Sequence, residues 1–209
     1  MKKYMDKLSR KIRFNKNLFV FLIVLVLVGV GSGALFSVIL SNDDKAMVSN
    51  YLNDFMLNVS NNSLKLDVSF FNSLVFTLGF ALLIWIFGIS MIGVIMVLPF
   101  LFIKSFILGF SIGSILVNFK FKGILISLVY IVPHHVINIL VYILLSAYSI
   151  MVSYRLIKCM RGRKVLDFKV FMGKYTFVLL FSMGLLFITS LYEAFILPSV
   201  LKLLINLLK

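Results

Sequence analysis

The longest apolar run in this 209-residue chain covers residues 73–119, and Lys104 is its only charged residue. A single helix of that length would extend about 70 Å at 1.5 Å per residue, more than twice the roughly 30 Å of bilayer hydrocarbon. The run must therefore reverse and predicts a hairpin of two membrane-spanning helices. We place the turn at "GISMIG", residues 88–93, because glycine and serine favour a chain reversal there.

The composition restricts the whole chain to the same class. Hydrophobic residues make up 62% of the sequence, and the mean hydropathy is +1.11. Soluble domains are closer to half apolar. Barrel strands would alternate over about 10 residues, whereas the apolar runs here are far longer and continuous. We therefore expect an all-α integral membrane protein with about five transmembrane helices, the N-terminus cytoplasmic and the C-terminus outside.

Two further spans flank the hairpin run at a distance. Residues 18–40 form the first span, which exceeds the 7–15 apolar residues of a signal peptide and precedes no cleavage site, so we expect it to remain as an anchor. Residues 175–197 form the last span. The whole chain is expected to be one polytopic membrane domain, residues 1–209.

The segment 122–154 is longer than one ordinary span and contains Pro133. Proline lacks the backbone N–H and kinks or breaks a helix. We expect a broken helix here, with a short piece ending near Val132 and a longer helix beginning at His134. Whether this segment crosses the membrane or re-enters it stays open.

Charge sets the expected orientation. Of the net charge of +14, most is carried by the 1–17 tail and the 155–174 loop. Cytoplasmic loops are enriched in Lys and Arg, so both segments are predicted to be cytoplasmic. Since these residues adjoin membrane spans, topology explains them and no nucleic-acid partner is expected. Lys120 and Lys122 would then lie outside, against this rule.

The predicted outer surface has two amphipathic parts. In the external loop 41–72, one helical face carries Val48, Tyr51, Leu52, Phe55 and Val59. This face either rests on the membrane interface or docks a partner. The tail 198–209 is also amphipathic, and it either lies on the outer leaflet or extends the last span.

A few polar residues interrupt the spans. Lys104 either faces the protein interior or extends its stem to the cytoplasmic surface. Gly109 and Gly113 continue a stripe of small residues that allows close helix packing. His134 and His135 are adjacent, which is the wrong spacing for two ligands from one helical face, so no metal site is expected.

Glu193 is the only glutamate of the chain, and Pro198 follows it by five positions. A buried carboxylate needs a partner. Lys104 is expected in the inner half of the membrane and Glu193 in the outer half, so His134 or His135 are the better candidates. The alternative is an acid exposed at the outer interface.

Enzymatic features are missing from the sequence. It has no P-loop, no recognisable Ser-His-acid set and no Gly-rich dinucleotide turn, and Cys159 is its single cysteine. We therefore expect no catalytic activity and no cofactor.

Two motifs carry a family resemblance. The run "GISMIGVIMVLPFLFIKSFILGFSIGSIL" and the segment "SLYEAFILP", behind a basic N-terminal tail, resemble stage II sporulation protein M. The resemblance implies a multi-pass protein of the bacterial cell membrane, at the sporulation septum of the mother cell during engulfment. It further implies a non-enzymatic scaffold for two peptidoglycan hydrolases, the stage II sporulation proteins D and P. The sequence is also compatible with a homo-oligomer.

The residues leave a second function open. Transporters use discontinuous helices and intramembrane charges at substrate sites, so the broken helix, Lys104 and Glu193 also fit a permease subunit. Such a subunit would need a separate ATPase, because the chain has no nucleotide-binding motif.

Overall fold

The computed structural model describes residues 16–60, 66–160 and 168–207, and all regular structure in these ranges is helical. The expected all-α class is therefore confirmed for this part of the chain. The elements are α2 (Lys16–Ile39), α3 (Asn42–Ser60), α4 (Leu66–Ile89), α5 (Gly93–Ile126), η1 (Ser127–Ile131), α6 (Val132–Met160), α7 (Phe168–Leu191), η2 (Tyr192–Ile196) and α8 (Leu197–Leu207).

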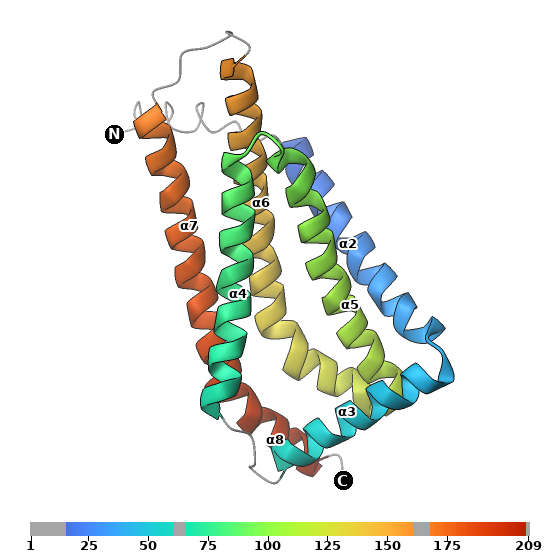
Figure 1. Ribbon diagram of the computed structural model, residues 1–209. Helices are drawn as coiled ribbons and strands as arrows, with labels where there is room; N and C mark the ends of the chain where they lie inside the picture. The colour runs from blue at the N-terminus through green and yellow to red at the C-terminus, as the bar shows by residue number, and fades with distance from the viewer. Residues whose placement is uncertain (1–15, 61–65, 161–167, 208–209) are drawn as a thin grey trace.

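Five long helices, α2, α4, α5, α6 and α7, run side by side as a bundle (Figure 1). The shorter α3 and α8 cross one end, which we call the α3/α8 end. Four helical stretches in the described ranges are long and apolar enough to cross a membrane: Lys16–Ile39, Phe70–Ile89, Gly93–Met160 and Phe171–Leu203. Helices suit the hydrocarbon core of a membrane because each one satisfies its own backbone hydrogen bonds without water.

The first reversal lies between α4 and α5, at residues 90–92, inside the "GISMIG" segment. The Ser90 N–H donates to Phe87 O at 3.0 Å, and the Gly93 N–H donates to Ser90 O at 3.0 Å. Ser153 of α6 caps this turn, since its hydroxyl lies 3.0 Å from Gly88 O and 2.6 Å from Ser90 O. Phe87 O and Gly88 O, two of the last carbonyls of α4 that a helix end leaves without partners, are thereby satisfied.

The 68-residue stretch Gly93–Met160 reverses at Lys120. There φ is 49° and ψ is −124°, close to the first central position of a type II′ turn, which glycine normally occupies. Such a conformation costs a non-glycine residue about 1–3 kcal/mol. After the turn Gly123 packs on α5, where an added Cβ would lie 2.5 Å from Ile115 O. The main part of α5 and α6 consequently run antiparallel (Figure 1).

The expected break at Pro133 is absent. The chain stays helical through this residue, and the π-helical turn η1 precedes it. In η1 the Val132 N–H donates to Ser127 O, five residues earlier. A wider turn makes room for the proline ring, which would clash with the carbonyl four residues back in an α-helix. Pro133 therefore does not interrupt the helix, and the interruption lies at Lys120.

Pro198 has the same arrangement. The π-helical turn η2 precedes it, and the Leu197 N–H donates to Tyr192 O. The helix thus continues beyond the predicted span 175–197, as α8, which turns across the end of the bundle (Figure 1).

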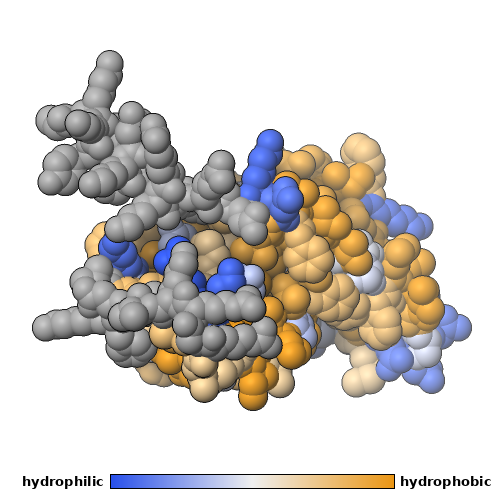
Figure 2. All heavy atoms as spheres, turned by 90° about the horizontal axis from the view of Figure 1, so that it is seen from above, coloured by the Kyte–Doolittle hydropathy of each residue, from blue (hydrophilic) through white to orange (hydrophobic). Residues whose placement is uncertain are grey.

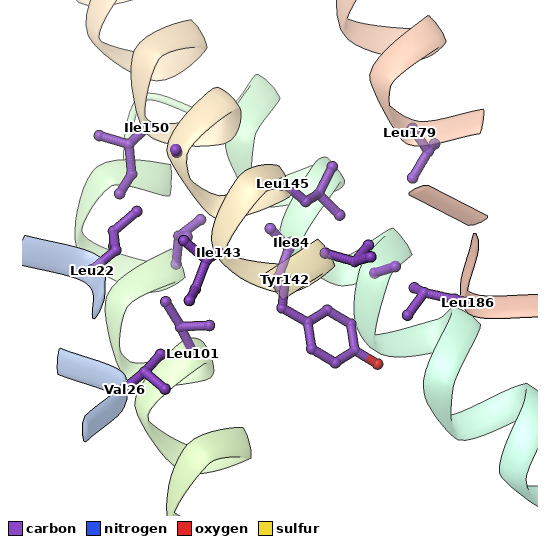
Figure 3. Packing of buried hydrophobic residues seen from close by; sticks show 14 residues of the cluster. Leu22, Val26, Ile84, Leu101, Tyr142, Ile143, Leu145, Ile150, Leu179 and Leu186 are labelled. Carbon is purple, nitrogen blue, oxygen red and sulfur yellow. The ribbon is translucent and has the colours of Figure 1, made fainter. Parts of the chain in front are cut away.

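The bundle core consists of aliphatic side chains around Tyr142 (Figure 3). Leu22 of α2, Leu101 of α5, Ile84 of α4 and Leu186 of α7 are fully buried, as is Tyr142 of α6. The sides of the bundle remain apolar on the outside (Figure 2), with exposed Leu, Ile, Val and Phe on every long helix. A surface of this kind suits lipid tails.

The apolar face of α3 packs inward. Leu52, Phe55, Met56 and Val59 join a second core cluster with Ile131 and Leu201. Tyr51, which the sequence placed on the same face, is instead 72% exposed. The 41–72 loop therefore contributes a packed part of the protein, and its apolar face is not available for docking.

Candidate functional site: a polar cluster around Glu193

Glu193 lies in η2 and is half-buried. Its Oε2 accepts a 2.6 Å hydrogen bond from the Ser73 hydroxyl of α4. Hydrogen bonds to a carboxylate are stronger than those between neutral groups. The direct partner of the acid is thus a serine of another helix, which the sequence analysis did not identify.

The two histidines contact each other, and His134 interacts electrostatically with Glu193. His134 is buried at the start of α6, and its ring centroid is 4.1 Å from that of His135 and 6.3 Å from that of Tyr130. Glu193 interacts electrostatically with both His134 and Tyr130. The hydrogen-bond partner of Glu193 is Ser73, in place of the histidine that was expected, and the interaction with His134 is electrostatic.

Two further polar contacts join the same helices. The Thr189 hydroxyl of α7 lies 2.5 Å from Asn138 Oδ1 of α6 and 2.9 Å from Leu186 O. The Tyr142 hydroxyl of α6 donates to Thr77 O of α4 at 3.1 Å. Buried polar atoms cost free energy unless they are paired, so these contacts stabilise one relative arrangement of α4, α6 and α7.

Some buried polar atoms near these contacts have no hydrogen-bond partner within the part of the chain that the structure describes. They include His134 Nδ1, Ser127 Oγ and Ser190 Oγ. Polar atoms of this kind are usually satisfied by ordered water.

Lys104 points into the bundle. Its Nζ lies 5.4 Å from the ring centroid of Phe80 on α4 and 5.8 Å from that of Tyr142 on α6. A cation over an aromatic face is stabilised by the ring quadrupole. Of the two alternatives for Lys104, the geometry favours the interior one. It also interacts electrostatically with Glu193, although no ion pair between them is found in the described residues.

Gly109 and Gly113 lie at the contact between α5 and α2. A Cβ on Gly109 would clash with the Val30 backbone carbonyl, and one on Gly113 would clash with the Ser37 hydroxyl. Gly33 of α2 is the reciprocal position, since its Cβ would meet Phe106 O. Small residues therefore permit the close approach, as the sequence predicts.

Among the residues that the structure describes, no three His, Cys, Asp or Glu side chains could hold a metal ion together. Glu193, His134 and Lys104 belong to η2, α6 and α5, and Glu193 interacts electrostatically with both other residues.

The comparison with family models decides the identity. The model of stage II sporulation protein M matches residues 19–198. The chain belongs to the stage II sporulation protein M family. This match confirms the resemblance inferred from the two motifs and extends from α2 to Pro198. No curated protein and no solved structure matches the chain.

Family membership assigns the chain to a sporulation-related membrane protein. The stage II sporulation protein M match includes every candidate residue of the sequence analysis: Glu193, Pro198, Lys104, Gly109, Gly113, Pro133, His134 and His135. Sequence reasoning missed Ser73, Asn138 and Thr189. Serine and threonine are common in membrane helices, so only the isolated Asn138 in an apolar segment offered a signal.

Proposed function

We propose that this protein is a non-enzymatic membrane scaffold of the engulfment machinery, which holds peptidoglycan-degrading enzymes at the septal membrane of the mother cell. Family membership supports a role in sporulation. The partners we infer are the stage II sporulation proteins D and P.

The topology we propose has five crossings, α2, α4, α5, α6 and α7. The end of α6 and the start of α7 lie at the end of the bundle opposite α3 and α8 (Figure 1), and in the sequence these two helix ends carry Arg155, Lys158, Lys169 and Lys174. The positive-inside rule makes that end cytoplasmic. The α3/α8 end then faces outward, on the side of the cell wall.

The outward face of α3 carries the proposal. Met47 and Tyr51 are 71% and 72% exposed, and with the exposed Asp54 they follow one another at helical spacing on one stripe. Behind them Leu52, Phe55 and Val59 fix the helix to the bundle. A rigid helix with exposed Met and Tyr next to a carboxylate suits a protein partner, since aromatic residues and Met are enriched in interfaces.

A photo-crosslinking amino acid at Met47 tests the assignment in sporulating cells. We expect adducts with a peptidoglycan hydrolase. The matched control is the same amino acid at Leu27, which is 64% exposed on the lipid-facing side of α2 and should yield lipid adducts only.

Two results would contradict the scaffold. Lipid adducts alone from Met47 would indicate that α3 contacts the membrane interface instead. Co-purification of an ATPase without hydrolases would favour the permease subunit, for which Lys104 and Glu193 are the candidate path residues.

A further inference from the structure

The reversal after the main part of α5 presents a basic and aromatic tip. Lys120, Phe121 and Lys122 are all exposed, and Phe121 has 78% of its surface accessible, the largest value of any large hydrophobic residue in the described ranges. An isolated exposed phenylalanine is common, but here two lysines flank it directly.

The length of α5 is sufficient to bring the tip to headgroup depth when the helix crosses the membrane. From Gly93 to the residue before Lys120, α5 rises about 40 Å at 1.5 Å per residue. This length exceeds the hydrocarbon core of about 30 Å and reaches the headgroup region, which extends the bilayer to about 40–45 Å. Phe121 can therefore enter the acyl boundary while the lysine stems extend to the phosphates.

The backbone conformation of Lys120 indicates that a lysine is retained at the tip although glycine would fit there without strain. Lys120 has a φ of 49°, a conformation that glycine adopts without strain, and Gly123 stands only three positions later. A non-glycine residue with such angles is held there against a local preference. The charge of Lys122 next to it adds to a positive end that the positive-inside rule does not predict.

We propose that Lys120, Phe121 and Lys122 form a binding site for anionic lipid headgroups. The lysines bind the lipid phosphate, and Phe121 inserts between them into the acyl boundary. The site anchors the reversal within α5, at Lys120, to the bilayer. This inference depends on α5 crossing the membrane and not on the scaffold function.

Fluorescence quenching in vesicles tests it with the full chain. The variant Trp85→Phe/Phe121→Trp carries one tryptophan, at the tip. Trp85 is a suitable residue to replace because its Nε1 is buried without a partner in the described part of the chain, and phenylalanine retains a ring against Tyr175. The tryptophan is exposed in turn to brominated phosphatidylglycerol and to brominated phosphatidylcholine, at equal mole fraction.

We expect brominated phosphatidylglycerol to quench the tip tryptophan about twofold more strongly, since each lysine near the surface attracts anionic lipid. Adding Lys120→Gln and Lys122→Gln should make the two lipids equal. The control Lys45→Gln, a lysine of α3, should leave the preference unchanged. High salt should also abolish the lipid preference of the chain with both lysines intact, because it screens the lysine charges from the lipid headgroups.

Three outcomes would overturn the proposal. The first is an absence of quenching by either lipid, which would place the tip outside the bilayer. The second is equal quenching by both lipids before any lysine is changed. The third is a preference that inorganic phosphate removes but chloride at the same ionic strength does not, which would identify a site for soluble phosphate.

Discussion

The Ser73 hydroxyl donates a 2.6 Å hydrogen bond to the Glu193 carboxylate, joining residues 120 positions apart. Ser73 lies on α4 and Glu193 in the π-helical turn before Pro198, so the contact attaches the last part of the chain to the middle of it. Its removal should therefore affect stability and function together.

Replacement of Ser73 by alanine should lower the free energy of unfolding by about 1.5–3 kcal/mol, the usual range for a hydrogen bond to a charged group. Thermal unfolding in detergent or nanodiscs measures this. Ser111→Ala is the control, because that hydroxyl bonds only to Ile107 O of its own helix. In a double-mutant cycle with Glu193→Gln the two changes should not be additive, and additive losses would show that the pair is not coupled.

Glu193→Gln preserves shape and removes the charge. We expect it to impair engulfment more than Asp167→Asn, an acid of the 155–174 loop that lies outside the described residues. Microscopy of membrane migration in sporulating cells compares the two. Equal tolerance would remove Glu193 from the functional residues.

Gly33→Ala should destabilise the bundle by about 1–3 kcal/mol, since its Cβ would meet the Phe106 carbonyl oxygen and force α2 away from α5. Gly31→Ala is the matched control two positions away, where nothing lies within 4 Å of the added Cβ. Alanine is the better helix former, so Gly31→Ala should be neutral or stabilising. Equal unfolding temperatures for the two variants would contradict the close contact.

Tyr175→Phe should cost about 1 kcal/mol, because the hydroxyl bonds to both Ser149 Oγ at 2.7 Å and Trp85 O at 2.9 Å. The exposed Tyr154 offers a control, since Tyr154→Phe keeps its ring under Lys158. Chemical denaturation in mixed micelles compares both with the native chain. A larger loss for Tyr154→Phe would be inconsistent with the structure.

Lys120→Gly and Lys120→Ala separate strain from charge. Both remove the charge, but only glycine relieves the positive φ, so Lys120→Gly should be more stable than Lys120→Ala by about 1 kcal/mol or more. Thermal unfolding measures the difference. A more stable alanine variant would mean that the turn does not hold this backbone conformation in the bilayer.

The parts of the fold that the sequence predicts are those set by hydropathy and by glycine. The length of the apolar run required a reversal, and the α4–α5 turn lies in the glycine-containing segment expected for it. The placement of Lys104 stayed open in the sequence analysis. A lysine about two turns into a membrane helix can either face the protein interior or extend its side chain to the cytoplasmic surface.

The break predicted at Pro133 was wrong for a physical reason, whereas the reversal at Lys120 falls between the predicted hairpin 73–119 and the segment 122–154. Proline was expected to break the helix at Pro133, but the π-helical turn before it provides room for the proline ring. The helix is interrupted instead at Lys120, and a lysine in the sequence gives no signal for a positive φ. Likewise the partner of Glu193 depends on the tertiary arrangement of α4 and η2, and nothing in the local sequence around Ser73 indicates it.

The packing of α3 against α8 has a consequence for biogenesis. Val59 and Leu201 belong to the same buried cluster although they enter the membrane at opposite stages of synthesis. In the topology we propose, α3 is translocated early, and its packing partner on α8 is synthesised last. A chain that stops before α8 lacks the contact of Leu201 with the cluster around Val59, so we expect the proposed partner stripe on α3 to be fully supported only once α8 has been made.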